Sequence, residues 1–170
     1  MRLDIRRAVI GDEEVLRELR IQALTDAPEA FGSTLERELA RTVEDWRKWL
    51  TPGVTFLVLA DGKPRGLVAG VYDAADRNVV HLMAMWVQPA VRGSGAANLL
   101  VTAVKDWAAE VGASQVRLNV VESNVRARRC YERAGFRATG RRGIVAKSGD
   151  TEIEMAWMVG DGSLDATAES

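Results

Sequence analysis

The pattern of apolar and polar positions along the chain predicts short strands that alternate with helices. Apolar and β-branched residues in alternating or continuous runs of strand length are typical of β-structure. Asp61-Gly62 separates two such runs and predicts a tight hairpin between them. The runs that predict strands are 3–7, 54–60, 65–72, 78–87, 115–121, 136–142 and 151–159.

Apolar residues at helical spacing fill most of the chain between these strands. Acidic residues at 12–14, after Gly11, favour the start of a first helix, which Asp26-Ala27-Pro28 ends. A turn-rich connector at 28–34 then leads to a second helical region. The other expected helices begin at Thr42, after the glycines at 93–95 and at Asn124.

The strand at 78–87 leads into the stretch that carries the clearest candidate chemistry. Pro89 ends the strand because proline has no N–H to donate to a ladder. Gly93 and Gly95 follow, and then comes an apolar helical pattern that ends near Gly112. A strand, a glycine-rich turn and a helix point several unpaired backbone N–H groups at one place, where an anion such as phosphate binds. If the helix is a crossover, strands 78–87 and 115–121 run parallel.

The spacing of the glycines distinguishes between the known phosphate-binding loops. A P-loop requires Gly-Lys-Ser/Thr, which is absent here. A dinucleotide fingerprint needs a third glycine where this chain has Asn98, and an acidic residue after the next strand, which 115–121 lacks. The segment Arg92 to Ala97 instead reads Arg-x-x-Gly-x-Ala, directly after a strand and Val-x-Pro.

A second group of residues lies on the helix that begins at Asn124. Taken singly, Asn124 is explained as a helix N-cap, Tyr131 as a core residue and Gly135 as a C-cap. Taken together, residues 124–136 read N-x-x-A-x-x-x-Y-x-x-x-G-F. This order and the loop at 92–97 resemble the two signatures of the GCN5-related N-acetyltransferase (GNAT) family, and the resemblance extends over roughly Leu3 to Val159.

Composition adds few constraints. The chain has 170 residues, a net charge of −1 and one cysteine, Cys130. The near-zero charge does not favour a nucleic-acid or membrane partner, and no apolar run approaches the roughly 20 residues that span a bilayer. We expect a single domain at 1–160, a disordered tail at 161–170 and a cytoplasmic protein without an internal disulfide.

The resemblance implies an α+β, three-layer αβα fold, with a mixed and mostly antiparallel sheet and a splayed parallel strand pair at 79–87 and 115–121. It also implies that acetyl-CoA lies between those strands, as co-substrate, and that no metal is needed. Backbone groups at 85–87 would pair with the pantetheine arm, and N–H groups at 92–97 would hold the pyrophosphate. The cofactor-binding residues implied are Met85, Trp86, Val87, Arg92, Gly93, Ser94, Gly95, Ala96, Ala97, Asn119, Asn124 and Tyr131.

The implied reaction is attack of a primary amine, on a small molecule or a peptide, at the thioester carbonyl in a ternary complex. Tyr131 resembles the family's usual proton donor to the leaving thiolate. The base remains open: His81 is the only histidine, a type of side chain that exchanges protons near neutral pH, but it is equally explained as a structural residue. Glu122, Glu29 and a water chain are the alternatives.

Other expectations are less specific. The acceptor pocket is expected to involve Glu29 and Phe31 of the 28–34 connector, although no motif identifies the amine. A non-catalytic acyl-CoA-binding sensor of the same fold is the alternative function, and it could dispense with Tyr131. The last strand alternates and has an apolar face that includes Trp157, so we expect a homodimer through that end of the sheet.

Overall fold

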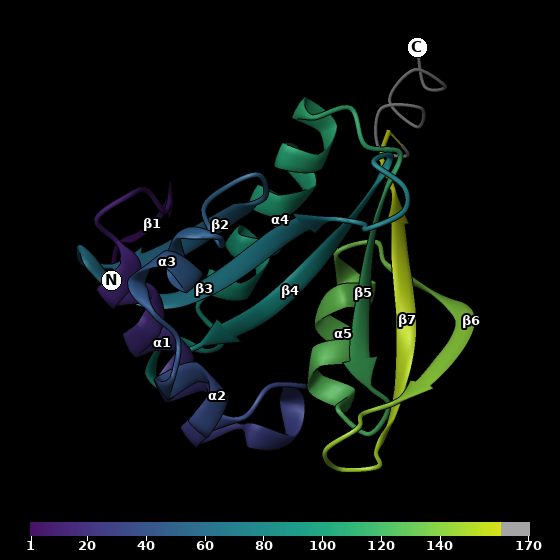
Figure 1. The fold of residues 1–170 in the computed structure, drawn as a ribbon. Coiled ribbons are helices and arrows are strands. Elements are labelled where there is room, and N and C mark those ends of the chain that lie inside the picture. The colour runs from purple at the N-terminus through teal and green to yellow at the C-terminus, as the bar shows by residue number, and fades with distance from the viewer. Residues whose placement is uncertain (161–170) are drawn as a thin grey trace.

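A seven-stranded mixed sheet forms the centre of the computed structural model, which describes residues 1–160 (Figure 1). The strand order is β1-β2-β3-β4-β5-β7-β6, and only the β4–β5 pair is parallel. All seven predicted strands are present, with bounds within two residues of those expected. They are β1 (Leu3–Arg7), β2 (Val54–Ala60), β3 (Lys63–Tyr72), β4 (Val79–Val87), β5 (Gln115–Val121), β6 (Arg137–Ile144) and β7 (Thr151–Met158).

Five α-helices and two short 3₁₀ turns connect the strands. Thr42 and Asp45 cap the start of α3 reciprocally, as the threonine before the helix predicted. The second helical region is broken into short pieces, which the apolar spacing did not resolve. The bounds are α1 (Glu13–Asp26), η1 (Pro28–Ala30), α2 (Leu35–Leu39), α3 (Val43–Arg47), η2 (Pro89–Val91), α4 (Ala96–Glu110) and α5 (Val125–Arg133).

The sheet is covered on both faces, which gives the three layers that were expected. On one face, α4 and α5 pack on a core that includes Leu82, Leu100 and Tyr131. On the other face, α1 and α3 pack over β1 to β4 around Leu16 and Trp46. Trp46 is buried, whereas Trp49 is only partly covered.

The parallel strands β4 and β5 pair only near their starts (Figure 1). The paired residues are Val79 with Gln115, Val80 with Val116 and His81 with Arg117. Beyond His81 no residue of β4 is paired with β5. Ala84 has a positive φ of 58°, and the register with β3 shifts at this point, so a bulge redirects β4 where the two strands part. The splayed pair is therefore present.

Three other expectations concern the tail at 161–170, membrane-spanning helices and the homodimer. The predicted tail at 161–170 lies outside the described residues. Within residues 1–160, no helix has the length and apolar character to cross a membrane. The apolar face of β7 is already used inside the molecule, because Ile153 and Met155 are buried in the core on the α4 side. The expectation of a homodimer therefore depends on the resemblance and on the exposed strand β6 at the edge of the sheet.

We expect β6 to mediate the homodimer, since an uncovered edge strand offers unpaired backbone groups to a second copy. Light scattering at micromolar concentration should give twice the chain mass of 18.6 kDa. Proline at Arg141, whose N–H donates to Thr139 Oγ1 in the irregular part of β6, should distort this edge strand and shift the mass towards the monomer. A monomeric mass for the unmodified chain would contradict this expectation.

Candidate active site

A cavity of about 970 Å³ opens where β4 and β5 part. The end of β4, the glycine loop, the start of α5 and the α1–η1 segment contribute to its walls. Eleven of the residues singled out from the sequence line it, although they come from four separate parts of the chain. They are Glu29, Phe31, Met85, Trp86, Val87, Arg92, Gly93, Gly95, Ala97, Asn124 and Tyr131.

The glycine loop, residues 92–97, leads into α4, and several of its residues line this cavity. Gly93 and Gly95 have φ values of +79° and +94°, a conformation that favours glycine. No side chain caps the start of α4, so the first-turn N–H groups are not used by a cap. A side chain at either glycine would meet no protein atom within 4 Å, which leaves open space above the loop. The backbone dipole and these N–H groups suit an anion such as a pyrophosphate.

Arg92 is held against the protein next to this loop. Its Nε donates to the Val87 carbonyl at 3.0 Å and its Nη2 donates to Asp26 Oδ2 at 2.6 Å. The Trp86 indole N–H donates to the same carboxylate oxygen at 3.0 Å. The indole and the guanidinium together lower the pKa of Asp26. Asp26 therefore ties the end of α1 to the end of β4, a role that the sequence did not reveal.

Tyr131 projects from α5 into the same cavity. It is 7% exposed, and its ring packs edge-on against Phe136 at 5.9 Å. Burial raises the pKa of Tyr131 above its ordinary value, so the hydroxyl is protonated at neutral pH. Among the described residues that hydroxyl has no hydrogen-bond partner. It is thus a proton donor without a protein acceptor, next to the open cavity.

Other residues of α5 complete this side. Asn124 Oδ1 accepts a hydrogen bond from the Ala127 N–H at 3.2 Å, so the asparagine acts as the N-cap. Arg126, Cys130 and Arg133 also line the cavity, which the sequence did not indicate. These three residues lie at i, i+4 and i+7 of the helix, a spacing that could have grouped them on one face with one another but not with Tyr131.

Several expected site residues do not line the cavity. Ser94 and Ala96 are not lining residues, since the Ser94 hydroxyl donates to the Val91 carbonyl and Ala96 is buried, and Asn119 is exposed on β5. Glu122 pairs with Arg142 through its side chain. These positions belong to the elements around the cavity without contributing to its surface.

His81 lies at the point where β4 and β5 separate, outside the cavity lining. Its Nε2 is 2.7 Å from Asp73 Oδ1. This contact, with two backbone N–H donors, lowers the pKa of Asp73 to about 2. The carboxylate therefore stays ionised and orients the imidazole. Because His81 does not line the cavity, a proton would reach it from the cavity only through water.

The other end of the cavity is bounded by the α1–η1 connection and the loop between β6 and β7. Glu29 and Phe31 lie on the first segment and Asp150 on the second. Lys147 joins the two, because its Nζ donates to the Pro28 carbonyl at 2.7 Å and to the Ser33 carbonyl at 2.5 Å. This cross-link joins residues more than a hundred positions apart.

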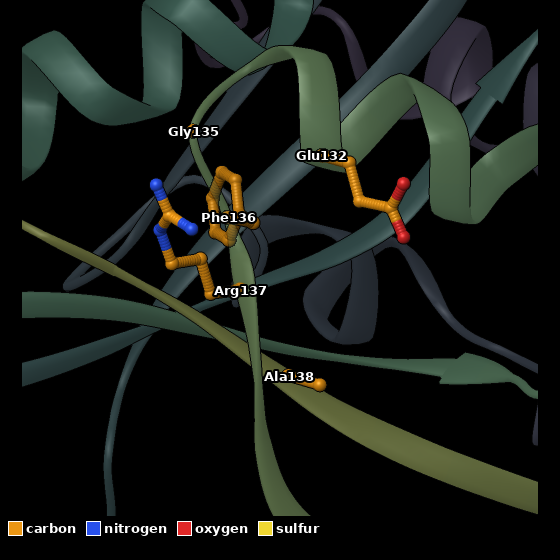
Figure 2. A pocket seen from close by; sticks show the side chains of 5 residues that line it. All are labelled: Glu132, Gly135, Phe136, Arg137 and Ala138. Atoms are coloured by element: carbon orange, nitrogen blue, oxygen red, sulfur yellow. The ribbon is translucent and has the colours of Figure 1, made fainter.

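A second, smaller hollow of about 390 Å³ lies between the end of α5 and the start of β6. Figure 2 shows its five lining residues, with the Glu132 and Arg137 side chains on opposite sides of Phe136. None of the expected site residues borders this hollow. The convergence of the glycine loop, Tyr131 and the separated strands favours the larger cavity as the active site.

Comparisons with known proteins agree with this assignment. The model of the "Acetyltransferase (GNAT) family" matches residues 18–136. Mycothiol acetyltransferase from Thermobispora bispora is 33% identical over 129 residues, which is 74% of this chain but only 43% of that protein.

Two solved structures show the same fold. An acetyltransferase of the GNAT family from Streptococcus pneumoniae superposes with a TM-score of 0.79 at 22% identity, over 94% of this chain and 100% of that one. A putative acetyltransferase from Salmonella typhimurium, determined with its cofactor acetyl-CoA, gives 0.75 at 19% identity, over 94% and 95%.

The glycine loop makes a direct prediction. Aspartate at Gly95 adds a carboxylate and a side chain above the anion cradle, so the affinity for acetyl-CoA should fall at least tenfold by calorimetry. Aspartate at Gly112 is the matched control, because Gly112 also has a positive φ and open space but lies beyond the far end of α4. Equal affinities for the two variants, both folded by circular dichroism, would show that the cradle lies elsewhere.

Proposed function

Because this chain belongs to the acetyltransferase (GNAT) family, we propose that it transfers the acetyl group of acetyl-CoA to a primary amine of a small molecule or a peptide. The observation that carries the proposal is the single cavity that joins a helix-start anion cradle to a buried tyrosine hydroxyl. The acetyl-CoA named for the Salmonella typhimurium protein of the same fold is consistent with it.

The residues present fit acetyl-CoA along this cavity. The open space above Gly93 and Gly95 matches the pyrophosphate, which the loop N–H groups would hold. The β5-facing edge of β4 beyond His81 has no strand partner, so the backbone at Met85 and Val87 would bind the amides of the pantetheine arm. Arg126 and Arg133 would give this end of the cavity positive charge towards the phosphates.

Acetyl-CoA would supply the thioester, whose C–S bond breaks as the new C–N bond forms. The residues position the two reactants and move protons, and positioning alone accounts for much of the rate. The Tyr131 hydroxyl would donate its proton to the departing sulfur and regain one through water from the amine nitrogen. In this step the nitrogen of the neutral amine loses one proton and the thiol gains one; the proton that a protonated amine releases before the attack goes to a separate base.

The amine must be neutral when it attacks, so a base has to accept its proton. His81 would accept that proton through a bridging water, with Asp73 holding the ring in one orientation. Glu29, which lines the cavity directly, is the alternative acceptor.

Phenylalanine at Tyr131 tests the proton donor. The change keeps the ring and its packing on Phe136, so kcat should fall about a hundredfold while acetyl-CoA affinity stays within about twofold. Phenylalanine at Tyr72 is the control, since that ring packs on Trp107 outside the cavity. A kcat within twofold of wild type for Tyr131→Phe, with chemistry rate-limiting, would remove the tyrosine from the mechanism.

Glutamine at His81 tests the base. If His81 accepts the proton, the rate of the wild-type enzyme should fall towards acidic pH, since a protonated imidazole cannot act as a base. His81→Gln should be slower and lack this decline, and Glu29→Gln should retain it. A wild-type pH profile in His81→Gln would instead assign the step to Glu29, Glu122 or water.

A further inference from the structure

Arg20 of α1 is a buried cation for which the proposed chemistry has no use. The residue is 6% exposed, and its guanidinium lies over the Phe31 ring at 4.8 Å and the Trp49 ring at 5.5 Å. Its Nε and Nη1 have no hydrogen-bond partner among the described residues, and the nearest carboxylate oxygen, on Glu38, is 3.8 Å away. Burying a cation without hydrogen-bond partners costs free energy. The contacts of Arg20 with the two aromatic rings therefore call for a functional explanation.

Glu38 extends this arrangement to the other end of the connector. Its side chain is fully buried and accepts hydrogen bonds from Ser33 Oγ at 2.5 Å and from Arg41 Nε at 2.6 Å. The connection between α1 and α2 is therefore anchored from the inside at Phe31 and at Ser33. From the outside, Lys147 anchors the same connection through two of its carbonyl groups. A loop held on both sides can present one shape to a ligand.

This connection is also a wall of the cavity. Ala27, Ala30 and Phe31 line it from this side, and Met85 and Val121 line it from the ends of β4 and β5. All five are apolar and offer contact to carbon atoms, while Glu29 and Asp150 at the same end are carboxylates that suit the cationic end of an amine. Phe31 is the largest apolar group that the connector contributes, and it is partly buried, with the Arg20 guanidinium over its ring.

We infer that Phe31 selects the acceptor amine by contacting its carbon skeleton, and that Arg20 is the positioning residue that holds the Phe31 ring. The acceptor is then a primary amine on an apolar or aromatic skeleton. This inference rests on the proposed function and extends it to the acceptor. A guanidinium over a ring restrains the plane of that ring, which an aliphatic side chain in the same place does not do.

Phenethylamine is the probe that tests the wall, and methylamine is the matched amine without a skeleton. Binding of each to the CoA-loaded protein is measured by ligand-observed NMR, and binding of acetyl-CoA by calorimetry. Phenethylamine should bind the wild type at least tenfold more tightly than methylamine. Phe31→Ala should remove most of that difference, since it deletes apolar contact area, and should leave the acetyl-CoA affinity unchanged. Leu39→Ala, at an exposed position of α2, should change neither affinity.

The positioning role has its own test. Arg20→Met combined with Glu38→Gln removes the cation together with the charge of its carboxylate neighbour, and the glutamine oxygen can still accept hydrogen bonds from Ser33 and Arg41. This double variant should lose phenethylamine affinity severalfold, retain the acetyl-CoA affinity and give an unchanged circular dichroism spectrum. Arg20→Lys with Glu38 retained keeps the charge without the planar group and should give an intermediate affinity.

The outcomes separate the two proposals. If acetyl-CoA fails to bind the wild type, the proposed function is wrong. If acetyl-CoA binds but phenethylamine binds no better than methylamine, or binds Phe31→Ala as tightly as the wild type, the inference about the wall is overturned. Wild-type phenethylamine affinity in the double variant would show that Arg20 does not position Phe31.

Discussion

The separation of β4 from β5 after His81 is the constraint on which the rest of the site depends. A parallel pair that continued in register would bury its backbone groups and leave no room between the strands. Because the pairing stops after three residues and Ala84 adopts a positive φ, β4 turns away and one of its edges is left without a strand partner. That edge, the glycine loop beyond it and α5 then surround one cavity.

The two ends of the cavity differ in chemical character. At the α4–α5 end, backbone N–H groups and arginines provide positive charge, and Tyr131 contributes a buried hydroxyl that is protonated at neutral pH. At the η1 end, an apolar wall is held by the buried Arg20 and by Lys147. Asp26 connects the ends, since it accepts hydrogen bonds from Trp86 and Arg92 at the last residue of α1. A substitution of Asp26 would therefore disturb the structure at both ends of the cavity.

Much of this was predictable from the sequence because the signals are local. Apolar runs, alternating or continuous, predicted most of the strands, and the loop at 92–97 and the helix at 124–136 each carry their motif within about a dozen residues. The contacts that were missed join distant parts of the chain: Asp26 lies 66 residues from Arg92, and Lys147 lies 119 residues from Pro28. No local pattern marks such a pair. The partial burial of Phe31 against Arg20 likewise depends on how a connector folds back on α1, and β7 looked like an interface because its burial in the core is a tertiary effect.

A crystal structure of the protein with acetyl-CoA is the most direct measurement of the central claim. It should show the pyrophosphate within hydrogen-bond distance of N–H groups between Arg92 and Ala97, and the pantetheine arm along β4 beside Met85 and Val87. The thioester sulfur should lie within reach of the Tyr131 hydroxyl. A ligand seated instead in the hollow beside Phe136 and Arg137, or one that crosses the sheet without touching β4, would contradict the account.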